Sequence, residues 1–324
     1  MIIADMLPTD STEGAVRLTD WGLIRAQGAD AASFLHGQLT QDVLHLPEGT
    51  ARLAGYCSAK GRLLASFVVW RGGADEILLA CSADLLAQTL KRLSMFVLRA
   101  KCKLSDASAD LALWGVAGAS APAAMGLPAS AAWTVLRTPA LSADEQAGST
   151  AIRLPDACGV ARWLWVQPAQ SAAPAPTALD MEAWRWLEVC SGVARIQAAT
   201  VEQFVPQMVN LELVGGVNFQ KGCYPGQEVV ARSQYRGTLK RRSLRYESSA
   251  ALGAGQEVFD PADPGQPAGQ VVLAAGSSSG RYTALVEVKL GAASSALHLS
   301  SAEGPVLEPA DLPYPLPNLE AEAT

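Results

Sequence analysis

The sequence is short of histidine and has no closely spaced cysteines. Its three histidines are His36, His45 and His298, and none lies near a cysteine along the chain, so a cysteine-protease arrangement has little support. The six cysteines never occur as a CxxC pair, which argues against zinc ribbons and dithiol redox motifs. No metal site is therefore predicted, and most cysteines are expected to be small buried residues. They are Cys57, Cys81, Cys102, Cys158, Cys190 and Cys223.

Positive charge is also in short supply. The net charge is -6 at pH 7, so no general positive field would draw the protein to nucleic acid or to an anionic membrane. One basic cluster is predicted to be a solvated face rather than an RNA site. Its members are Arg232, Arg236, Lys240, Arg241, Arg242 and Arg245. Direct contact with nucleic acid is therefore not expected.

Signals for secretion or membrane insertion are missing as well. Residues 1–14 contain acids and no long apolar core, unlike a secretory signal. Residues 111–136 carry no charge, but they contain Pro122 and Pro128 and are rich in alanine. That composition suits a strand followed by a short packed helix better than a membrane span. A cytoplasmic protein without membrane contact is predicted.

The chain is long enough for several globular units. It has 324 residues, whereas single domains commonly run to ~100 to 200 residues. Hydrophobic residues make up 49% and charged residues 17%, a balance typical of folded rather than disordered proteins. Two or three domains with a substantial core are expected.

The first hundred residues alternate between strand and helix patterns. One helix is predicted at 31–40 after Asp30, and a second begins after Ser82, because both residues are favourable N-caps. This order is typical of the split βαβ or ferredoxin-like arrangement within the α+β class. The predicted strands cover residues 21–26, 51–56, 62–70, 76–81 and 101–104.

The remaining patterns predict two further units. Strands near 111–116 and 161–166, with an alanine-rich helix between them, indicate a second α+β unit. Thr177 and Asp180 have the spacing of a cap and first-turn acid, which predicts a helix ending near Cys190. Beyond residue 241 short alternating strands are separated by turns, which favours a small antiparallel β-barrel at the carboxyl end.

The chemistry of the chain is expected to centre on residues 221–228, Lys-Gly-Cys-Tyr-Pro-Gly-Gln-Glu. Gly222 and Gly226 permit positive φ or close backbone approach, and the proline between them stiffens the turn. A short helix is predicted over 227–235, closed by Gly237. Lys221 and Cys223 would then precede a helix N-terminus, a setting that favours a reactive thiolate. The alternative for Cys223 is a small buried apolar residue.

This octapeptide resembles the KGCYxGQE signature of the YgfZ family, the folate-binding relatives of the glycine-cleavage T-protein. The signature loop comprises Lys221, Gly222, Cys223, Tyr224, Gly226, Gln227 and Glu228, with Arg232 following. Further blocks resemble the family between about residues 18 and 316. They cover residues 21–42, 60–62, 204–211, 236–241 and 312–314.

The resemblance implies both a fold and a division into domains. The fold would be that of the glycine-cleavage T-protein, with layered α+β folate-binding domains and a small carboxyl-terminal barrel. The amino-terminal domain would comprise residues 18–106 with 204–236, and the second α+β domain residues 107–203. The barrel would comprise residues 237–324.

The resemblance also implies a cofactor, namely tetrahydrofolate or a one-carbon derivative. Trp21 and Trp184 match positions where family tryptophans are implicated in folate binding, and stacking on an indole suits a flat pteridine. The alternative is that either indole is simply a core residue. The partners implied are iron-sulfur enzymes, contacted transiently and including those that thiolate tRNA.

Two departures from the wider superfamily bear on activity. Cys190-Ser191-Gly192 stands where the family commonly has Glu-Ala-Gly, so the usual carboxylate for the pterin is absent, and nearby Glu188 is a candidate substitute. Residues 61–66 lack the catalytic aspartate of the T-protein, which argues against aminomethyl transfer. A folate-dependent transferase stays open as an alternative function, as does a scaffold whose loop only docks a partner.

Overall fold

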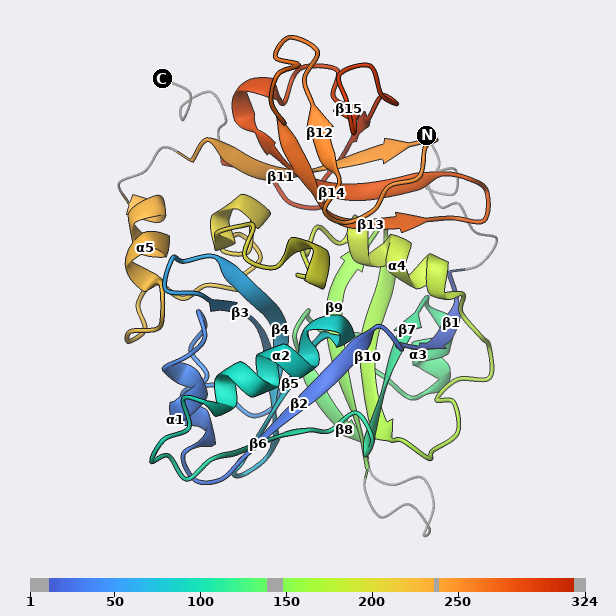
Figure 1. Cartoon of the computed structure of the whole chain (residues 1–324). Helices are drawn as coiled ribbons and strands as arrows, with labels where there is room; N and C mark the ends of the chain where they lie inside the picture. Colours follow the sequence, from blue (N-terminus) through green and yellow to red (C-terminus); the bar gives the residue numbers. More distant parts are fainter. Residues whose placement is uncertain (1–11, 139–147, 236–238, 318–324) are drawn as a thin grey trace.

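Three antiparallel sheets organise the part of the chain that the computed structural model describes, residues 12–138, 148–235 and 239–317 (Figure 1). Two of them pack with helices in the lower half of the view, and the third lies above them. The predicted α+β class is thereby confirmed. The predicted domain boundaries stay a prediction, and strand β1, which precedes residue 18, pairs with β7 in the second sheet.

The first sheet contains the strands predicted from the first hundred residues, in the order β3-β4-β5-β2-β6. Helix α2 (Ala83–Ser94) packs on it, and helix α1 ends at His36, four residues earlier than predicted. Ser82 does precede α2, but its hydroxyl caps no backbone N–H and accepts a hydrogen bond from Arg195 Nη1 at 2.9 Å. The elements are β2 (Trp21–Gln27), α1 (Ala31–His36), β3 (Ala51–Cys57), β4 (Leu63–Gly73), β5 (Glu76–Ser82) and β6 (Lys103–Asp106).

The second sheet has the order β1-β7-β10-β9-β8 and carries helix α4 (Met181–Cys190) against it. Gly115 on β7 makes this packing possible, because a Cβ there would lie 2.5 Å from the indole of Trp184. Asp180 occupies the N-cap of α4 without a side-chain capping bond. The other elements are β1 (Gly14–Arg17), β7 (Leu111–Ala117), α3 (Ser120–Ala124), β8 (Val135–Thr138), β9 (Ser149–Ala157) and β10 (Val160–Pro168).

The third sheet is the curled antiparallel sheet predicted as a barrel, with strand order β15-β12-β13-β14-β11-β16. It has an apolar core of its own, and β13 packs on α4 (Figure 1), while Val272 and Leu273 of β13 belong to the core of the lower sheets. Strands β12 and β16 were not predicted. The elements are β11 (Arg241–Ser248), β12 (Glu257–Phe259), β13 (Gly269–Gly276), β14 (Tyr282–Lys289), β15 (His298–Leu299) and β16 (Glu308–Ala310).

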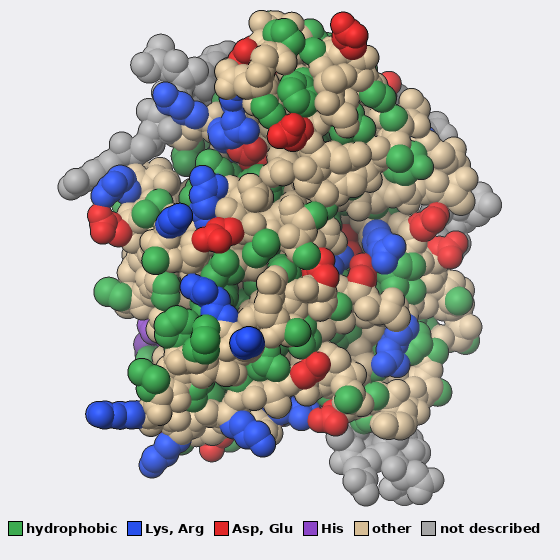
Figure 2. Space-filling view, viewed as in Figure 1, with side chains coloured by type: hydrophobic (Ala, Val, Ile, Leu, Met, Phe, Trp, Pro, Cys, Tyr) green, Lys and Arg blue, Asp and Glu red, His purple; other side chains and the backbone are tan. Residues whose placement is uncertain are grey.

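The prediction of a solvated basic face near residue 240 is wrong for two arginines. Arg242 and Arg245 are buried, and they pair with Glu212 and Glu247 respectively. Arg232 is exposed as predicted, while Arg236 lies outside the described residues. Acidic and basic side chains are interspersed over the face drawn in Figure 2. Within the described ranges, no helix is long and apolar enough to cross a membrane.

Candidate functional site

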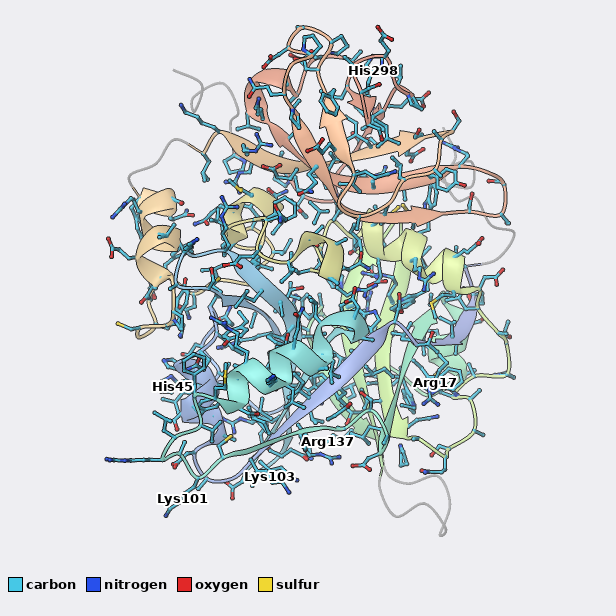
Figure 3. The ribbon with its side chains drawn as sticks, in the orientation of Figure 1. Arg17, His45, Lys101, Lys103, Arg137 and His298 are labelled. Atoms are coloured by element: carbon cyan, nitrogen blue, oxygen red, sulfur yellow. The ribbon has the colours of Figure 1, made fainter. Side chains whose placement is uncertain are left out.

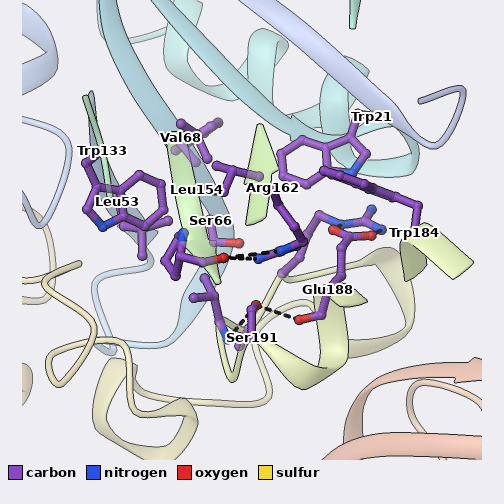
Figure 4. Close-up of a pocket in the computed structure, with 15 residues that line it drawn as sticks. Trp21, Leu53, Ser66, Val68, Trp133, Leu154, Arg162, Trp184, Glu188 and Ser191 are labelled. Carbon is purple, nitrogen blue, oxygen red and sulfur yellow. Dashed lines mark hydrogen bonds and ion pairs between the residues drawn. The ribbon is translucent and has the colours of Figure 1, made fainter. Parts of the chain in front are cut away.

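A pocket opens between the first two sheets and α4, and it contains both tryptophans predicted to bind folate (Figure 4). Trp21 begins β2 and is half-buried, whereas Trp184 on α4 is fully buried. Strand β4 contributes Ser66 to the wall. The pocket includes about 490 Å³ of empty space, part of it open to solvent, and about 40 Å³ of it can hold the centre of a water molecule. The structure therefore brings Trp21 and Trp184 to one site.

A buried ion-pair network holds the Trp21 side of this pocket. Arg195 donates to both carboxylate oxygens of Glu188 at 3.2 Å, and to Asp20 Oδ2 at the same distance. Its guanidinium lies 4.9 Å from the ring centroid of Trp21. Burial alone would lower the pKa of Arg195, but Glu188 and Asp20 more than offset it and raise that pKa. Arg195 thus connects α4 to the segment before β2.

Arg162, on β10, is a second buried cation in the pocket. Its Nε and Nη2 donate to the carbonyl of Pro155 at 3.2 and 3.1 Å, and its guanidinium lies 5.5 Å from the Trp184 ring. Among the described residues, no carboxylate makes an ion pair with it. Burial lowers the pKa of Arg162 to about 10, so it stays charged at neutral pH. A buried guanidinium with only a neutral acceptor is suited to an oxygen of a bound ligand.

Trp133 forms the opposite side of the pocket from Trp21 and Trp184 (Figure 4). Its φ of 71° is unusual for a bulky residue and costs conformational free energy on the order of 1 kcal/mol or more. Its backbone is held there by hydrogen bonds with Arg153 and Ala51. Trp133 and Arg162 were both missed in the sequence, because they fall in the stretch that has no diagnostic motif.

A second, more open hollow continues from this pocket. The two share Trp133, Leu154, Pro155, Ser191 and Val193, so they form an inner chamber and an outer vestibule. Tyr314, from the matched segment 312–314, lines the vestibule and donates to the carbonyl of Gly192 at 2.7 Å. A ligand with a flat ring and an extended tail would match this shape.

The residues present fit a pterin-like ring. The indole nitrogens of Trp21 and Trp184 are buried donors without a partner among the described atoms. Of the described residues that line the pocket, Glu188 alone has a carboxylate, and each of its oxygens accepts only one bond from Arg195. A carboxylate oxygen has a second lone pair, so Glu188 can still accept from a ligand's donor edge. Cys190 points elsewhere, toward Arg245.

The signature loop lies on a different part of the molecule, beside the turn between β3 and β4. Gly226 has φ 79°, and a Cβ there would lie 2.3 Å from the Ser58 carbonyl oxygen. A Cβ on Gly61 would lie 2.8 Å from the Cβ of Val229, so the matched segment 60–62 and the loop fit together through glycines. Gly222, in contrast, does not adopt positive φ. Helix α5 (Gln227–Tyr235) follows as predicted, and its closure by Gly237 lies outside the described residues.

Lys221 ties this loop to helix α1. Its ammonium donates to the carbonyls of His36 and Leu39 at 2.5 and 2.9 Å and lies 4.8 Å from the Tyr224 ring centre. Burial lowers the pKa of Lys221 to about 8, partly opposed by Asp42 and Cys223. Tyr224 is buried, while Cys223 is exposed at the tip of the loop.

His36 is a residue of this site that sequence spacing did not reveal. Its Nε2 would lie 3.5 Å from a Cβ on Gly222, and its Nδ1 is 3.0 Å from Asp42. Burial and the Lys221 charge lower the pKa of His36, which favours the neutral ring at pH 7. His45 also contacts Asp42. His298 lies in the third sheet, far from His45 (Figure 3). Over the described ranges, no three acidic, histidine or cysteine side chains converge as a metal site would require.

Known proteins with similar sequences decide the family. The tRNA-modifying protein YgfZ of Klebsiella pneumoniae (strain 342) is 35% identical over 252 residues, which is 74% of this chain and 74% of that protein. The chain belongs to the YgfZ family. A YgfZ of Edwardsiella ictaluri (strain 93-146) is 36% identical over 72% of this chain and 71% of its own length. A YgfZ of Vibrio vulnificus (strain YJ016) is 31% identical over 84% and 83%.

The fold of this YgfZ chain is shared with a solved structure. The glycine cleavage system aminomethyltransferase T from Bartonella henselae superposes with a TM-score of 0.71 over 93% of this chain and 86% of that protein. Sequence identity is 16%, so the likeness is one of fold. It confirms the predicted T-protein-like architecture. No family model matches the chain.

Proposed function

We propose that the chain is a folate-binding protein that supports iron-sulfur enzymes, including those that thiolate tRNA, with Cys223 as its reactive residue. The observation that carries the folate part is the pocket itself, where two indoles and the buried Arg162 line a narrow chamber that continues into a wider vestibule. The relatives named as tRNA-modifying proteins support the link to tRNA. Tetrahydrofolate or a one-carbon derivative is the proposed cofactor.

Each part of the pocket has a role in this proposal. Trp21 and Trp184 provide aromatic surface for the pteridine, and Glu188 accepts from its donor edge while Arg195 holds that carboxylate in place. Arg162 binds a ring carbonyl oxygen. The benzoylglutamate tail extends into the outer vestibule past Trp133.

The signature loop supplies the second half of the function. Cys223 is exposed, while its neighbours Lys221 and Tyr224 are anchored to α1 and the core. An exposed thiol on an anchored loop is open to a protein partner, and thiolates are the nucleophilic and metal-binding form of cysteine. The proposed partners are iron-sulfur enzymes, met transiently in the cytoplasm, without direct binding of nucleic acid or membrane.

A folate-dependent aminomethyltransferase is the second candidate, because the fold is shared with a T-protein. The pocket disfavours it. Ser66 of segment 61–66 lines the pocket with a hydroxyl that is engaged by the Ile196 backbone, and Glu188 is held by Arg195. Neither group is free to move a proton at the folate amine, which such a reaction requires.

Titration with 5-formyltetrahydrofolate, followed by calorimetry and tryptophan emission, tests the folate site. We expect saturable binding with quenching, and a loss of about 5- to 10-fold in affinity for Trp21→Ala, since aromatic stacking contributes about 1 kcal/mol beyond area. Arg162→Met removes a charged hydrogen bond and should cost ~10- to 100-fold.

Trp165→Phe is the matched control for that titration. Trp165 is a buried indole of the same sheet whose Nε1 is bonded to Gln167 at 2.7 Å, away from the pocket. The Trp165→Phe variant should bind 5-formyltetrahydrofolate with the affinity of the native protein. The pocket would be ruled out as the folate site if the native protein showed no saturable binding. The same conclusion would follow if Trp21→Ala and Arg162→Met bound as tightly as Trp165→Phe.

A further inference from the structure

Exposed apolar side chains gather where helix α2 ends. Met95, Phe96 and Leu98 are 59%, 45% and 86% exposed, and all three lie within the first residues after the helix. They account for three of the six large hydrophobic side chains that are exposed among the described residues. Single exposed apolar residues are ordinary on a protein surface, but a contiguous group of them indicates an interaction site.

The same segment is strongly basic. Residues 85–105 contain five cations and no acid, whereas the whole chain has a net charge of -6. Over the described ranges, none of the five forms an ion pair with a carboxylate. In Figure 3 Lys101 and Lys103 lie at the lower left, and Figure 2 shows basic and hydrophobic side chains close together in that region. The five cations are Lys91, Arg92, Arg99, Lys101 and Lys103.

A groove beside α2 adjoins this segment. It includes about 780 Å³ of empty space, part of it open to solvent, and about 350 Å³ of it can hold the centre of a water molecule, against about 40 Å³ in the pocket. Helix α2 and the residue after it supply Lys91, Arg92 and Met95, while Tyr56 of β3 and Leu64 of β4 also line the groove. The groove therefore has both apolar and cationic walls.

The groove lies beside the signature loop, because one turn connects the two. Tyr56 precedes Ser58 by two residues, and the carbonyl oxygen of Ser58 approaches Gly226 of the loop. Leu64 follows Gly61, the other turn residue in contact with the loop, by three residues, which is at most about 10 Å of backbone. A protein segment held in the groove would thus lie next to the loop that carries Cys223.

We propose that residues 91–103 and the groove form a docking surface for an acidic, partly apolar segment of the protein partner on which Cys223 acts. This inference rests on the proposed function of the loop. The five unpaired cations complement glutamates and aspartates, and Met95, Phe96 and Leu98 provide apolar contacts. Tyrosine, phenylalanine, methionine and arginine are enriched at protein interfaces, and all four occur on this surface. A nucleic-acid duplex or a membrane is too broad to enter the groove, which favours a protein segment.

Fluorescence anisotropy of a synthetic peptide tests the docking surface in the purified full-length protein. The probe is a fluorescein-labelled amphipathic helix of glutamate, leucine and phenylalanine, and the control peptide has lysine in place of glutamate. We expect saturable binding of the glutamate peptide alone, weakened by added salt because the exposed charges are screened. Met95→Asp and Arg92→Ala should each lower the affinity at least ~10-fold.

Two substitutions beside strands of the third sheet are matched controls. Val306→Asp changes an apolar side chain that is 50% exposed, and Lys240→Ala removes an exposed cation. Both variants should bind the probe with native affinity. No saturable binding by the native protein, or equal affinity in Met95→Asp and Val306→Asp, would overturn the proposal. So would binding of tRNA or of phosphatidylglycerol vesicles through the same side chains, because the occupant would then be a nucleic acid or a membrane.

A complementation measurement links the docking surface to Cys223. In a host that lacks the equivalent protein, Met95→Asp combined with Leu98→Asp should fail to restore tRNA thiolation, although its affinity for 5-formyltetrahydrofolate and the alkylation rate of Cys223 stay native. Val306→Asp should restore thiolation. Full restoration by the double variant would overturn docking of this partner. If the native chain itself restored nothing, the proposed function would fail instead, and the peptide titration would still decide whether the docking surface exists.

Discussion

Replacement of Arg195 by methionine should destabilise the protein more than any surface change of charge. Arg195 is 5% exposed and binds Glu188, Asp20 and Ser82, so its loss leaves the Glu188 carboxylate, 8% exposed, without its cation. Breaking one partner of a buried pair typically costs ~3 to 5 kcal/mol. With a urea dependence near ~3 kcal/mol per molar, that is a midpoint shift of about 1 to 2 M.

A double-mutant cycle followed by urea unfolding separates the pair from simple loss of packing. Arg195→Met with Glu188→Leu removes both charges, and should recover at least ~2 kcal/mol relative to the sum of the single variants. The exposed pair Arg232 and Glu228, with side chains 65% and 84% exposed, is the matched control and should show coupling of at most ~0.5 kcal/mol. A loss below about 1 kcal/mol for Arg195→Met, or strict additivity in the cycle, would refute the reasoning.

Three further outcomes are expected. In a host that lacks the equivalent protein, Cys223→Ser should stay soluble but fail to restore tRNA thiolation and growth under oxidative stress, with Lys221→Ala intermediate and Cys102→Ser normal; full rescue by Cys223→Ser would contradict a chemical role. With glycine-cleavage partner proteins, methylene-tetrahydrofolate should form at least ~10²-fold more slowly than with a true T-protein, because the acid-base group is lacking. Gly226→Ala should cost about 2 kcal/mol or more in thermal unfolding, whereas Gly265→Ala, with open space around it, should cost far less.

The parts of this fold that could be predicted are those with local signals. Helix α5 was predicted to the residue, because glycine and proline before it and the polar sequence within it are local features. The end of β5 and the start of α2 were predicted from Ser82 in the same way. Its hydroxyl, however, accepts a hydrogen bond from Arg195 and does not cap the helix. The resemblance placed Trp21 and Trp184 at one site, which periodicity alone could not do.

The parts that could not be predicted depend on which distant groups come together. Arg242 looks like part of a solvated basic stretch until its partner Glu212, 30 residues away, is known. Arg162 lies on a strand, and a strand pattern assigns side chains to two faces of the sheet. The pattern does not tell which of these faces packs against α4. Trp133 follows a stretch with no motif, and its left-handed backbone depends on hydrogen bonds with Arg153 and Ala51. Such features arise from packing between elements, which a linear pattern does not record.

Strand β4 connects the pocket and the signature loop. Its preceding turn holds Gly61 against the loop at Gly226, and five residues later Ser66 lines the pocket. Because Gly61 lies two residues before β4 begins at Leu63, the backbone between the two contacts spans at most about 17 Å, at about 3.3 Å per residue. The pocket and the loop thus contact the two ends of one short backbone segment, so a shift of this segment would move both.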